Sequence, residues 1–363
     1  MNNVLHICSY AYGTKVYEDL FCEFAKSNIK NTSVVTVAAD YDPRLLHTNY
    51  SQQILLEKKW YFSLFRQIGA RQLCRTLRHK LRHEEFDIIH SHSLYSNAIL
   101  GELLAKELRI PHVITVRSTD YAKIEKYDIR QKYFIRNVLR SAKAITFLTK
   151  RSEELFLQND PVFRKTLKNK LHIVPNGIDE VFFQNSGFVG RTGTNILFVG
   201  RVVRDKGVLS VVNAVKMLRK ITGKSFHLNV VGRPDDGKLL SKIKKQEFVT
   251  YSGVVNKKDL MKIYSSSDVL VLPSKNETFG LVYLEALAAG CRVLYSESNP
   301  IKSILEKFYP LSMPVEDCET NIYEKLRDIF KCEVKTSSDL TLDLTEFTWR
   351  KVAAKYLRVY END

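Results

Sequence analysis

The sequence is poor in cysteine, and its six cysteines form neither a CxxC pair nor a dense framework. Such scattered cysteines are typical of a reducing compartment and argue against a disulfide scaffold. No apolar run approaches the ~20 residues that a membrane-spanning helix needs. The N-terminus leads directly into a short apolar run, without the basic and long apolar segments of a signal peptide. We therefore expect a cytoplasmic protein.

The sequence also lacks the signatures of several function classes. It has no GxGxxG motif, which argues against a dinucleotide-dependent redox enzyme. No His or Cys pair has zinc-ligand spacing, and no DxD-type carboxylate pair stands in a suitable place, so we expect neither a metal nor a cofactor. No internal repeat or low-complexity segment is present. The 363 residues suffice for two cores of ordinary domain size.

What the sequence does contain is a regular alternation of short apolar runs with helical segments such as 15–25 and 258–265. Runs typical of buried strands occur at residues 3–8, 33–38, 86–90, 112–116, 144–148, 195–199, 227–232, 249–255 and 267–274. This alternation predicts an α/β protein with two doubly wound parallel sheets. In such sheets ligands bind at the carboxyl ends of the strands.

The most informative segment is NETFGLVYLEALAAG, residues 276–290, which follows the strand predicted at 267–274. It contains Glu277 and Glu285 with seven residues between them. A strand, a short loop and a helix N-terminus together present free backbone amides to an anion. A carboxylate beside such a site repels phosphate, but it is well suited to accept hydrogen bonds from hydroxyls. The segment could therefore hold a diphosphate, a sugar and a ribose.

A second cluster of charge lies in NILFVGRVVRDKG, residues 195–207. An apolar strand leads into Gly200 and Arg201, and Lys206 stands just before a helical run. Glycine lets the backbone approach closely, and the two cations face whatever anion lies at the strand end. Cations that are already in place stabilise negative charge that grows on such an anion.

Polar residues also follow predicted strands in the first half of the sequence. His90 and His92 close the run at 86–90, and Arg117 and Asp120 follow the run at 112–116. We expect His92, Arg117 and Asp120 to bind the acceptor or the sugar. For His90 we expect a buried histidine that is satisfied by the backbone.

Together, NETFGLVYLEALAAG and NILFVGRVVRDKG resemble the signature of retaining, nucleotide-sugar-dependent glycosyltransferases of the GT4 family. VPNGID at 174–179, a hinge-like run at 184–194 and a final helical run at 347–360 extend the likeness over the chain. The resemblance implies the GT-B fold, with two Rossmann-like doubly wound domains facing across a cleft. We expect an N-terminal acceptor domain at 1–180 with 347–363, and a C-terminal donor domain at 190–346.

The resemblance also implies roles for individual residues. Glu277 would hold the hydroxyls of the donor sugar and Glu285 those of the ribose. Arg201 and Lys206 would stabilise the leaving diphosphate in place of a metal. Further donor contacts would come from Gly13, Gly200, Gly232, Val254, Thr278, Phe279 and Gly280. Arg117 stands where family members frequently have a histidine. The implied mechanism is a front-face reaction in which the leaving phosphate helps to take the acceptor proton, and we assign no general base.

The donor and the acceptor stay open at this point. UDP-sugar is the default donor because it is the commonest type, and a carbohydrate or a lipid-linked sugar is the expected acceptor. One alternative is a non-catalytic GT-B-like protein that binds carbohydrate. Another is a sugar phosphorylase or a nucleotide-sugar epimerase on the same fold, although we find no cofactor lysine site for a phosphorylase.

Much of the formal net charge of +16 gathers between residues 58 and 83. From 70 to 82 the apolar residues fall on one face of a predicted helix. The other face carries Arg71, Arg75, Arg78 and Arg82, a row that repels itself unless something anionic lies against it. With the aromatic cluster at 60–65, this row predicts docking on anionic lipid at the inner membrane face. A solvated helix is the alternative, and nucleic-acid binding ranks last because no recognised motif is present.

Overall fold

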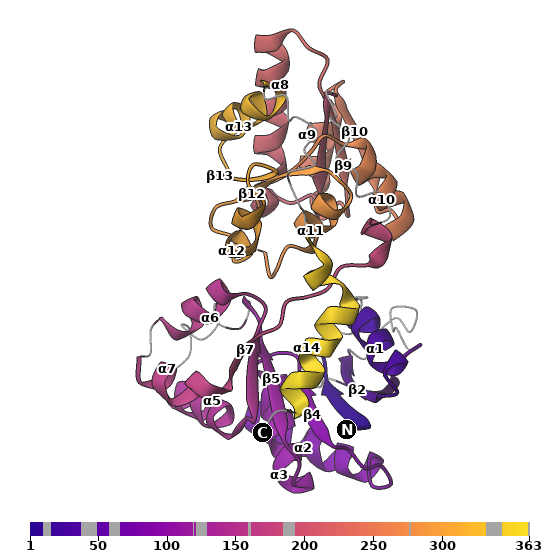
Figure 1. Ribbon diagram of the computed structural model, residues 1–363, viewed down its shortest axis with the longest axis vertical. Helices are drawn as coiled ribbons and strands as arrows, with labels where there is room; N and C mark the ends of the chain where they lie inside the picture. Colours follow the sequence, from indigo (N-terminus) through magenta and orange to yellow (C-terminus); the bar gives the residue numbers. More distant parts are fainter. Residues whose placement is uncertain are drawn as a thin grey trace. The chain divides into compact units, whose positions relative to one another are not determined.

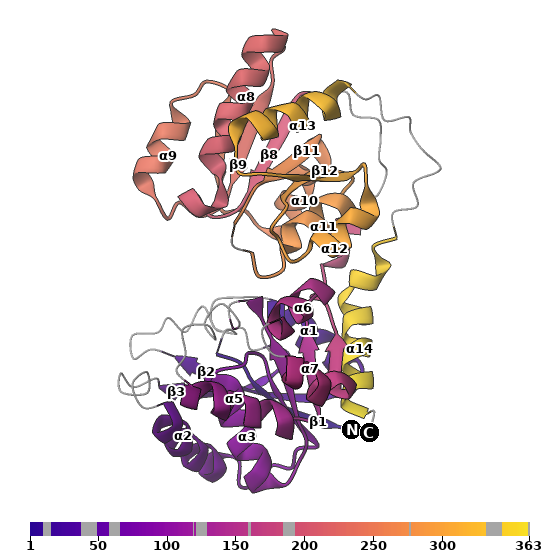
Figure 2. The same cartoon turned by 90° about the vertical axis from the view of Figure 1, so that its left-hand side faces the viewer.

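The computed structural model describes residues 1–9, 16–37, 49–57, 66–118, 120, 129–158, 161–183, 193–275, 277–331 and 343–361. The chain divides into two compact units (Figures 1 and 2). The first unit contains Met1–Gly177 and Trp349–Asp363, and the second contains Ile178–Thr348. Gly13, the aromatic cluster at 60–65 and most of the predicted hinge lie outside the described residues.

In the described part of the first unit, seven parallel strands form one sheet. In spatial order they are β3 (Gln52–Glu57), β2 (Lys30–Val37), β1 (Asn3–Ile7), β4 (Ile88–Ser91), β5 (His112–Val116), β6 (Ala144–Phe147) and β7 (Leu171–Ile173). The chain runs outward from β1 to β3 and then returns to β4 on the other side of β1. Strand order therefore reverses between β1 and β4, where open parallel sheets bind their ligands.

Helices cover both faces of this sheet (Figure 2). They are α1 (Val16–Lys26), α2 (Arg66–Lys80), α3 (Ser96–Leu108), α5 (Ile129–Ser141), α6 (Lys150–Leu157), α7 (Pro161–Leu167), the 3-10 turn η3 (Lys168–Lys170) and α14 (Trp349–Glu361). Successive strand residues face opposite layers, as the period of a strand requires. Val4 packs among side chains of α1 and α14, whereas its neighbour Leu5 packs among side chains of α2 and α3.

The C-terminal helix α14 completes the first unit, although the whole second unit separates it in the sequence. Its apolar face lies against α1 in one core cluster. At its start the Trp349 ring lies so close to Gly177 that a Cβ on this glycine would be 2.4 Å from the ring. Only glycine fits at this position, which explains the glycine of the VPNGID segment.

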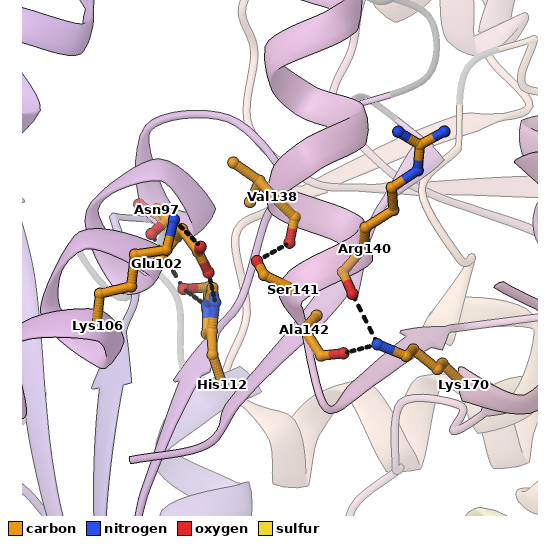
Figure 3. A network of polar contacts seen from close by, with 10 residues as sticks. Asn97, Glu102, Lys106, His112, Val138, Arg140, Ser141, Ala142 and Lys170 are labelled. Atoms are coloured by element: carbon orange, nitrogen blue, oxygen red, sulfur yellow. Dashed lines mark hydrogen bonds and ion pairs between the residues drawn. The ribbon is translucent and has the colours of Figure 1, made fainter. Parts of the chain in front are cut away.

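Polar contacts join Glu102 of α3 to the amino end of β5, and the end of α5 lines the same cavity (Figure 3). Glu102 bonds to Lys106 at 2.8 Å and lies 3.7 Å from Nδ1 of His112. Burial alone would raise the pKa of Glu102, but hydrogen bonds from His112, Lys106 and Ser141 lower it to about 2. These side chains border a cavity of about 550 Å³.

The lysine on the other side of this cavity acts as a helix cap. Lys170 Nζ donates to the carbonyl oxygens of Arg140 and Ala142 at 2.7 and 2.8 Å, as Figure 3 shows. These carbonyls lie at the end of α5, where a helix dipole favours a cation. These polar contacts thus stabilise the fold at the edge of the sheet opposite to the carboxyl ends of the strands.

In the described part of the second unit, a parallel sheet of six strands is present. In spatial order they are β10 (Val249–Gly253), β9 (His227–Val231), β8 (Asn195–Val199), β11 (Val269–Leu272), β12 (Arg292–Ser296) and β13 (Ser312–Val315). The helices are α8 (Val208–Thr222), α9 (Gly237–Lys244), α10 (Lys257–Ser266), α11 (Leu281–Ala288), α12 (Lys302–Leu305) and α13 (Glu319–Lys331). Four 3-10 turns are η4 (Glu180–Phe183), η5 (Arg204–Lys206), η6 (Glu306–Phe308) and η7 (Thr345–Phe347).

The two parallel sheets confirm the predicted α/β class. The expected apolar face of the basic helix is also confirmed, because Ala70, Cys74 and Leu77 are buried and Leu73 is partly buried. The helix ends at Lys80, so the buried Leu81 follows it. Four strands were not predicted: β3, β7, β12 and β13. Among the described residues, no helix combines the length and the apolar character needed to cross a membrane.

Candidate functional site

The strand order of the second unit reverses between β8 and β11. The two strands pair only through Ile196–Val269 and Leu197–Leu270, so their ladder ends before their carboxyl ends. The loops that follow these two strands carry the predicted residues Arg201, Lys206 and Glu277. The sequence motifs that lie about 70 residues apart are therefore brought to one edge of one sheet.

Lys206 and Glu277 form the central contact of this edge. Nζ of Lys206 lies 2.7 Å from Oε1 of Glu277. The side chains are only 9% and 17% exposed, which limits screening by water. Lys206 belongs to η5 after β8, and Glu277 belongs to the loop after β11. The pair therefore fixes two loops and places a cation beside a carboxylate.

Gly280 turns the chain from this loop into α11. It has a left-handed conformation with φ +86°, and a Cβ there would lie 2.6 Å from the Tyr283 ring. Glycine adopts this conformation without steric cost. Phe279 is buried beside it, whereas Thr278 is partly exposed. The first amides of α11 lack partners within the helix, as in every helix, and can donate to an anion.

Glu285 lies in the middle of α11 (Leu281–Ala288), whereas Glu277 lies in the loop before this helix. Oη of Tyr264 donates to Oε2 of Glu285 at 3.2 Å. Tyr264 comes from α10 and is fully buried, so burial raises its pKa and keeps the donor proton in place. The sequence analysis missed this contact, because nothing in the local pattern marks Tyr264 as more than a core aromatic residue.

Arg201 lies at the same edge but is more exposed than Lys206. Its Nη1 is 3.1 Å from Oδ2 of Asp235, while Nε of Arg233 lies 2.6 Å from Oδ1 of that carboxylate. The hydrogen bond from Arg233 lowers the pKa of Asp235. Asp235 is a second partner that the sequence analysis did not single out. It holds the guanidinium group of Arg201 over the loop that follows β9.

Gly232 brings the loops after β8 and β9 into contact. Its φ is +138°, and a Cβ there would lie 2.0 Å from the carbonyl oxygen of Gly200. Any larger residue at position 232 would push the two loops apart. Val254, the other predicted donor contact on this side, is 73% exposed after β10. The predicted donor residues of the second unit thus lie along the carboxyl ends of β8, β9, β10 and β11.

In the first unit, three buried histidines lie on or just after β1 and β4, the two strands between which the strand order reverses. The ring of His92 lies 3.9 Å from that of His90 and 5.2 Å from that of His6. His90 was expected to be satisfied by the backbone. It is buried, but its partners are side chains: the hydroxyls of Tyr360 at 2.6 Å and Thr115 at 2.7 Å.

Hydrogen bonds determine the tautomers of His6 and His92. The side-chain amide of Asn31 donates to three backbone carbonyls, so its oxygen faces Nε2 of His6 at 3.2 Å. Nε2 of His6 must therefore carry the proton, and its Nδ1 accepts from Nε2 of His92 at 3.0 Å. Burial lowers the pKa of His6 to about 3, although the Asn31 contact raises it. Burial also lowers the pKa of His92, so His92 is neutral, and with its proton on Nε2 its lone pair is on Nδ1.

These histidines predict a stability that falls in mild acid. Burial lowers the pKa of His6 from 6.5 to about 3, and it also lowers the pKa values of His90 and His92 and, outside the cluster, of His112 and His172, which act in the same direction. The unfolded state then binds more protons below pH 6.5, so stability is complete above this value and is lost as the pH falls toward 3. Each histidine contributes about 1.4 kcal/mol per pH unit within its window.

The Tm between pH 7 and 5 measures this effect, because carboxylates with ordinary pKa values hardly titrate there. We expect Tm to fall steadily over this range. A Tm that does not change between pH 7 and 5 would show that the histidines are not held neutral by the fold.

The three histidines are also the one group among the described residues that could hold a metal ion, since their ring nitrogens lie within 4.8 Å of one another. However, both nitrogens of His6 and both of His90 already bond to protein groups. A metal would have to displace these hydrogen bonds. The donor set therefore fits a neutral hydrogen-bonded chain better than a metal site, and the absence of a metal requirement stays a prediction.

Arg117 and Asp120 lie beside His92. Oδ2 of Asp120 accepts from the backbone amides of Leu94 at 3.1 Å and Arg117 at 2.9 Å. Nε of Arg117 donates to the carbonyl oxygen of His92 at 3.0 Å. Asp120 and His92 are buried. The structure brings the three predicted acceptor residues together, and their contacts hold the loops after β4 and β5. Their role in acceptor binding stays a prediction.

The basic face of α2 is exposed as predicted. Arg71, Arg75 and Arg78 lie on α2 and are exposed, whereas the exposed Arg82 lies in the turn after the helix, which ends at Lys80. Arg78 has a carboxylate nearby, since its Nη1 lies 3.9 Å from Oε2 of Glu107 on α3.

Family models match nearly the whole chain. One described as "Glycosyltransferase Family 4" matches residues 23–182, and one described as "Glycosyl transferases group 1" matches residues 183–341. Their junction falls at η4, close to the boundary between the two units. The second model therefore covers all the candidate donor residues described above except Gly13.

Individual proteins show the same likeness. The uncharacterized glycosyltransferase MJ1178 of Methanocaldococcus jannaschii is 26% identical over 287 residues, which are 77% of this chain and 76% of that protein. Sucrose-phosphate synthase from Thermosynechococcus elongatus has a TM-score of 0.76 at 16% identity, with 99% of this chain and 98% of that chain covered. Anabaena HepE, in complex with UDP and glucose, has a TM-score of 0.70 at 14% identity and covers 99% of each chain.

Proposed function

Because the chain belongs to the GT4 family of glycosyltransferases and has their GT-B fold, we propose that it is a retaining enzyme with UDP-sugar as its donor. The acceptor would be a hydroxyl of a carbohydrate or of a lipid-linked sugar, in cell-surface polysaccharide or glycolipid synthesis. The observation that carries the proposal is the Lys206–Glu277 pair where strand order reverses in the second unit. The HepE complex with UDP and glucose supports UDP as the default nucleotide.

A cation beside a carboxylate suits both parts of a nucleotide sugar. The ammonium group of Lys206 attracts the diphosphate, and the carboxylate of Glu277 accepts hydrogen bonds from sugar hydroxyls. As the bond between C1 and the phosphate oxygen breaks, negative charge grows on the phosphate. Lys206, Arg201 and the first amides of α11 would stabilise this charge, because they are already in place before the reaction.

Retention follows if the acceptor attacks from the side that the phosphate leaves. The acceptor oxygen bonds to C1 on that face, and its proton passes to the departing phosphate oxygen. This route needs no protein nucleophile and no protein base. It is consistent with the second unit, where Glu277 is already bonded to Lys206 and Glu285 to Tyr264.

The direct test is turnover of UDP-glucose by the purified protein in EDTA. We expect UDP release, slow with water and faster with a suitable carbohydrate acceptor, and an α-linked product identified by the anomeric proton coupling in NMR. A β-linked product would contradict retention, and activity only after adding Mg²⁺ would contradict metal independence. A requirement for free phosphate would identify a phosphorylase, and failure to bind any nucleotide would favour a non-catalytic protein.

Replacing Glu285 with alanine is expected to weaken donor binding more than turnover. A carboxylate that accepts hydrogen bonds from ribose contributes about 1.5–3 kcal/mol, so KM for UDP-glucose should rise about 10- to 100-fold with little change in kcat. Steady-state kinetics measure both constants. Tyr264→Phe is the matched control, since it removes only the 3.2 Å contact that orients Glu285 and should raise KM less. An unchanged KM in the alanine variant would remove Glu285 from the donor site.

We further propose that the basic face of α2 docks the enzyme on anionic lipid, where a lipid-linked acceptor would lie. Each basic residue near such a surface contributes about 1 kcal/mol, so R71Q/R75Q/R82Q should weaken vesicle binding about 100-fold. Sedimentation with anionic and neutral vesicles at low salt measures this. The control K242Q/K244Q/K245Q removes the same charge from exposed residues of the second unit. Equal losses for both variants would indicate unspecific attraction rather than docking by α2.

A further inference from the structure

We propose that Asp317, which lies outside every motif discussed above, is a positioning residue for the donor site. It holds together the two loops that carry Lys206 and Glu277. The expected effect of Asp317 on turnover rests on the proposed function, whereas its effect on the position of the two loops does not. Asp317 lies between β13 and α13, a region that contributes no other candidate residue.

One oxygen of the Asp317 carboxylate contacts the first turn of α8, which follows the turn of Lys206, and the other contacts the loop that carries Glu277. Oδ1 accepts from the hydroxyl of Ser210 at 2.7 Å. Ser210 lies in the first turn of α8, four residues after Lys206. Oδ2 lies 3.2 Å from Nζ of Lys275, which is two residues before Glu277. The Asp317 side chain is only 14% exposed, whereas Lys275 is 64% exposed.

The backbone also closes around this carboxylate. Gly207 has φ +73°, and a Cβ there would lie 2.8 Å from Oδ1 of Asp317 and 2.6 Å from Cγ of Pro273. The backbone amide of Lys275 donates to the carbonyl oxygen of Asp205 at 3.2 Å. Asp317 thus fills the narrow space between the turn after Lys206 and the turn before Glu277. Its charge also lies near the N-terminus of α8, where the helix dipole favours an anion.

Through these contacts Asp317 affects the relative position of Lys206 and Glu277, the pair that would bind the donor. The 2.7 Å separation of Lys206 and Glu277 depends on how the two loops lie against each other. Asp317 bonds to neither residue of the pair, so it acts through the loops. Groups that stabilise the transition state must already be in position before the reaction. A displacement of about 1 Å at such a group can lower the rate about 100-fold.

The experiment compares Asp317→Ala with Asp317→Asn and with the neighbouring control Glu316→Ala, whose side chain is exposed. We expect Asp317→Ala to lower kcat/KM for UDP-glucose about 10- to 100-fold, mainly through kcat. Asp317→Asn should retain more activity, because its amide oxygen can still accept from Ser210. Glu316→Ala should match the wild type. Tm of each variant shows whether the fold is kept.

A double-mutant cycle separates positioning from a general loss of stability. If Asp317 acts through Lys206, Asp317→Ala should have little further effect on kcat/KM in a Lys206→Ala background. An equal fold-loss in both backgrounds would overturn the inference. So would wild-type kinetics in Asp317→Ala.

Hydrogen exchange tests the same inference without any assumption about activity. Asp317→Ala should speed exchange in peptides that cover residues 200–210 and 273–280, and it should leave peptides of the first unit unchanged. Unchanged exchange in both loops would overturn the positioning role even if the protein turns over no nucleotide sugar. Conversely, a wild-type protein that binds no nucleotide would overturn the proposed function while the exchange result stands.

Discussion

Replacing Glu277 with alanine is expected to abolish most sugar transfer while leaving UDP binding largely intact. UDP has no sugar, so the hydroxyl contacts assigned to this carboxylate do not contribute to its binding. In the transition state the loss of a preset electrostatic contact costs about 10²–10³ in kcat. Turnover of UDP-glucose and calorimetric binding of UDP are the two measurements.

Two comparisons make this result specific. Glu277→Gln keeps the size of the side chain but not its charge, so a loss close to that of the alanine variant would show that charge is what matters. Glu285→Ala should have the opposite pattern, with weaker donor binding and nearly normal kcat. Equal and mild effects of the two alanine substitutions would contradict the division of roles between these acids.

Replacing Lys206 with alanine is expected to lower both transfer and UDP binding. The diphosphate is present in UDP as well as in the donor, so its fixed cation contributes to both. Because charge on the phosphate grows in the transition state, kcat should fall by a further ~10²–10³-fold. Isothermal titration with UDP and steady-state turnover of UDP-glucose measure the two parts.

Arg201→Ala is the comparison for this variant. Arg201 is about half exposed and bonds to Asp235, whereas Lys206 is largely buried against Glu277. The exposed cation is screened more strongly, so its removal should cost less. A larger loss for Arg201→Ala than for Lys206→Ala would mean that the diphosphate lies nearer to the loop after β9 than we infer.

The sequence was sufficient to predict the class of fold and the sheet edge on which the candidate donor residues lie. Apolar runs in alternation with helical segments predict parallel sheets, and strand ends in such sheets meet at one edge. Lys206 and Glu277 could therefore be expected near each other, although 71 residues separate them. Gly232 and Gly280 were predicted only as donor contacts, and their positive φ values show why glycine stands at these two positions.

Hydrogen-bond partners that are distant in the sequence could not be predicted in this way. Tyr264 resembles any core aromatic residue, and Asp235 resembles any loop acid, until the fold places them beside Glu285 and Arg201. The same holds for Asn31, which is 25 residues from His6 in the sequence. Its side-chain amide determines the tautomers of His6 and His92. The short edge strands β7 and β13 were missed because runs of three and four residues carry little periodic signal.

The most direct test of the account is nucleotide-induced thermal stabilisation of the wild-type protein in EDTA. UDP, GDP, ADP and CMP are compared, each with its sugar forms. We predict that one nucleoside diphosphate raises Tm clearly, without metal, and that the shift is lost in Lys206→Ala but kept in Glu277→Ala. No shift with any nucleotide, or a shift that Lys206→Ala leaves unchanged, would contradict a donor site at this edge of the second unit.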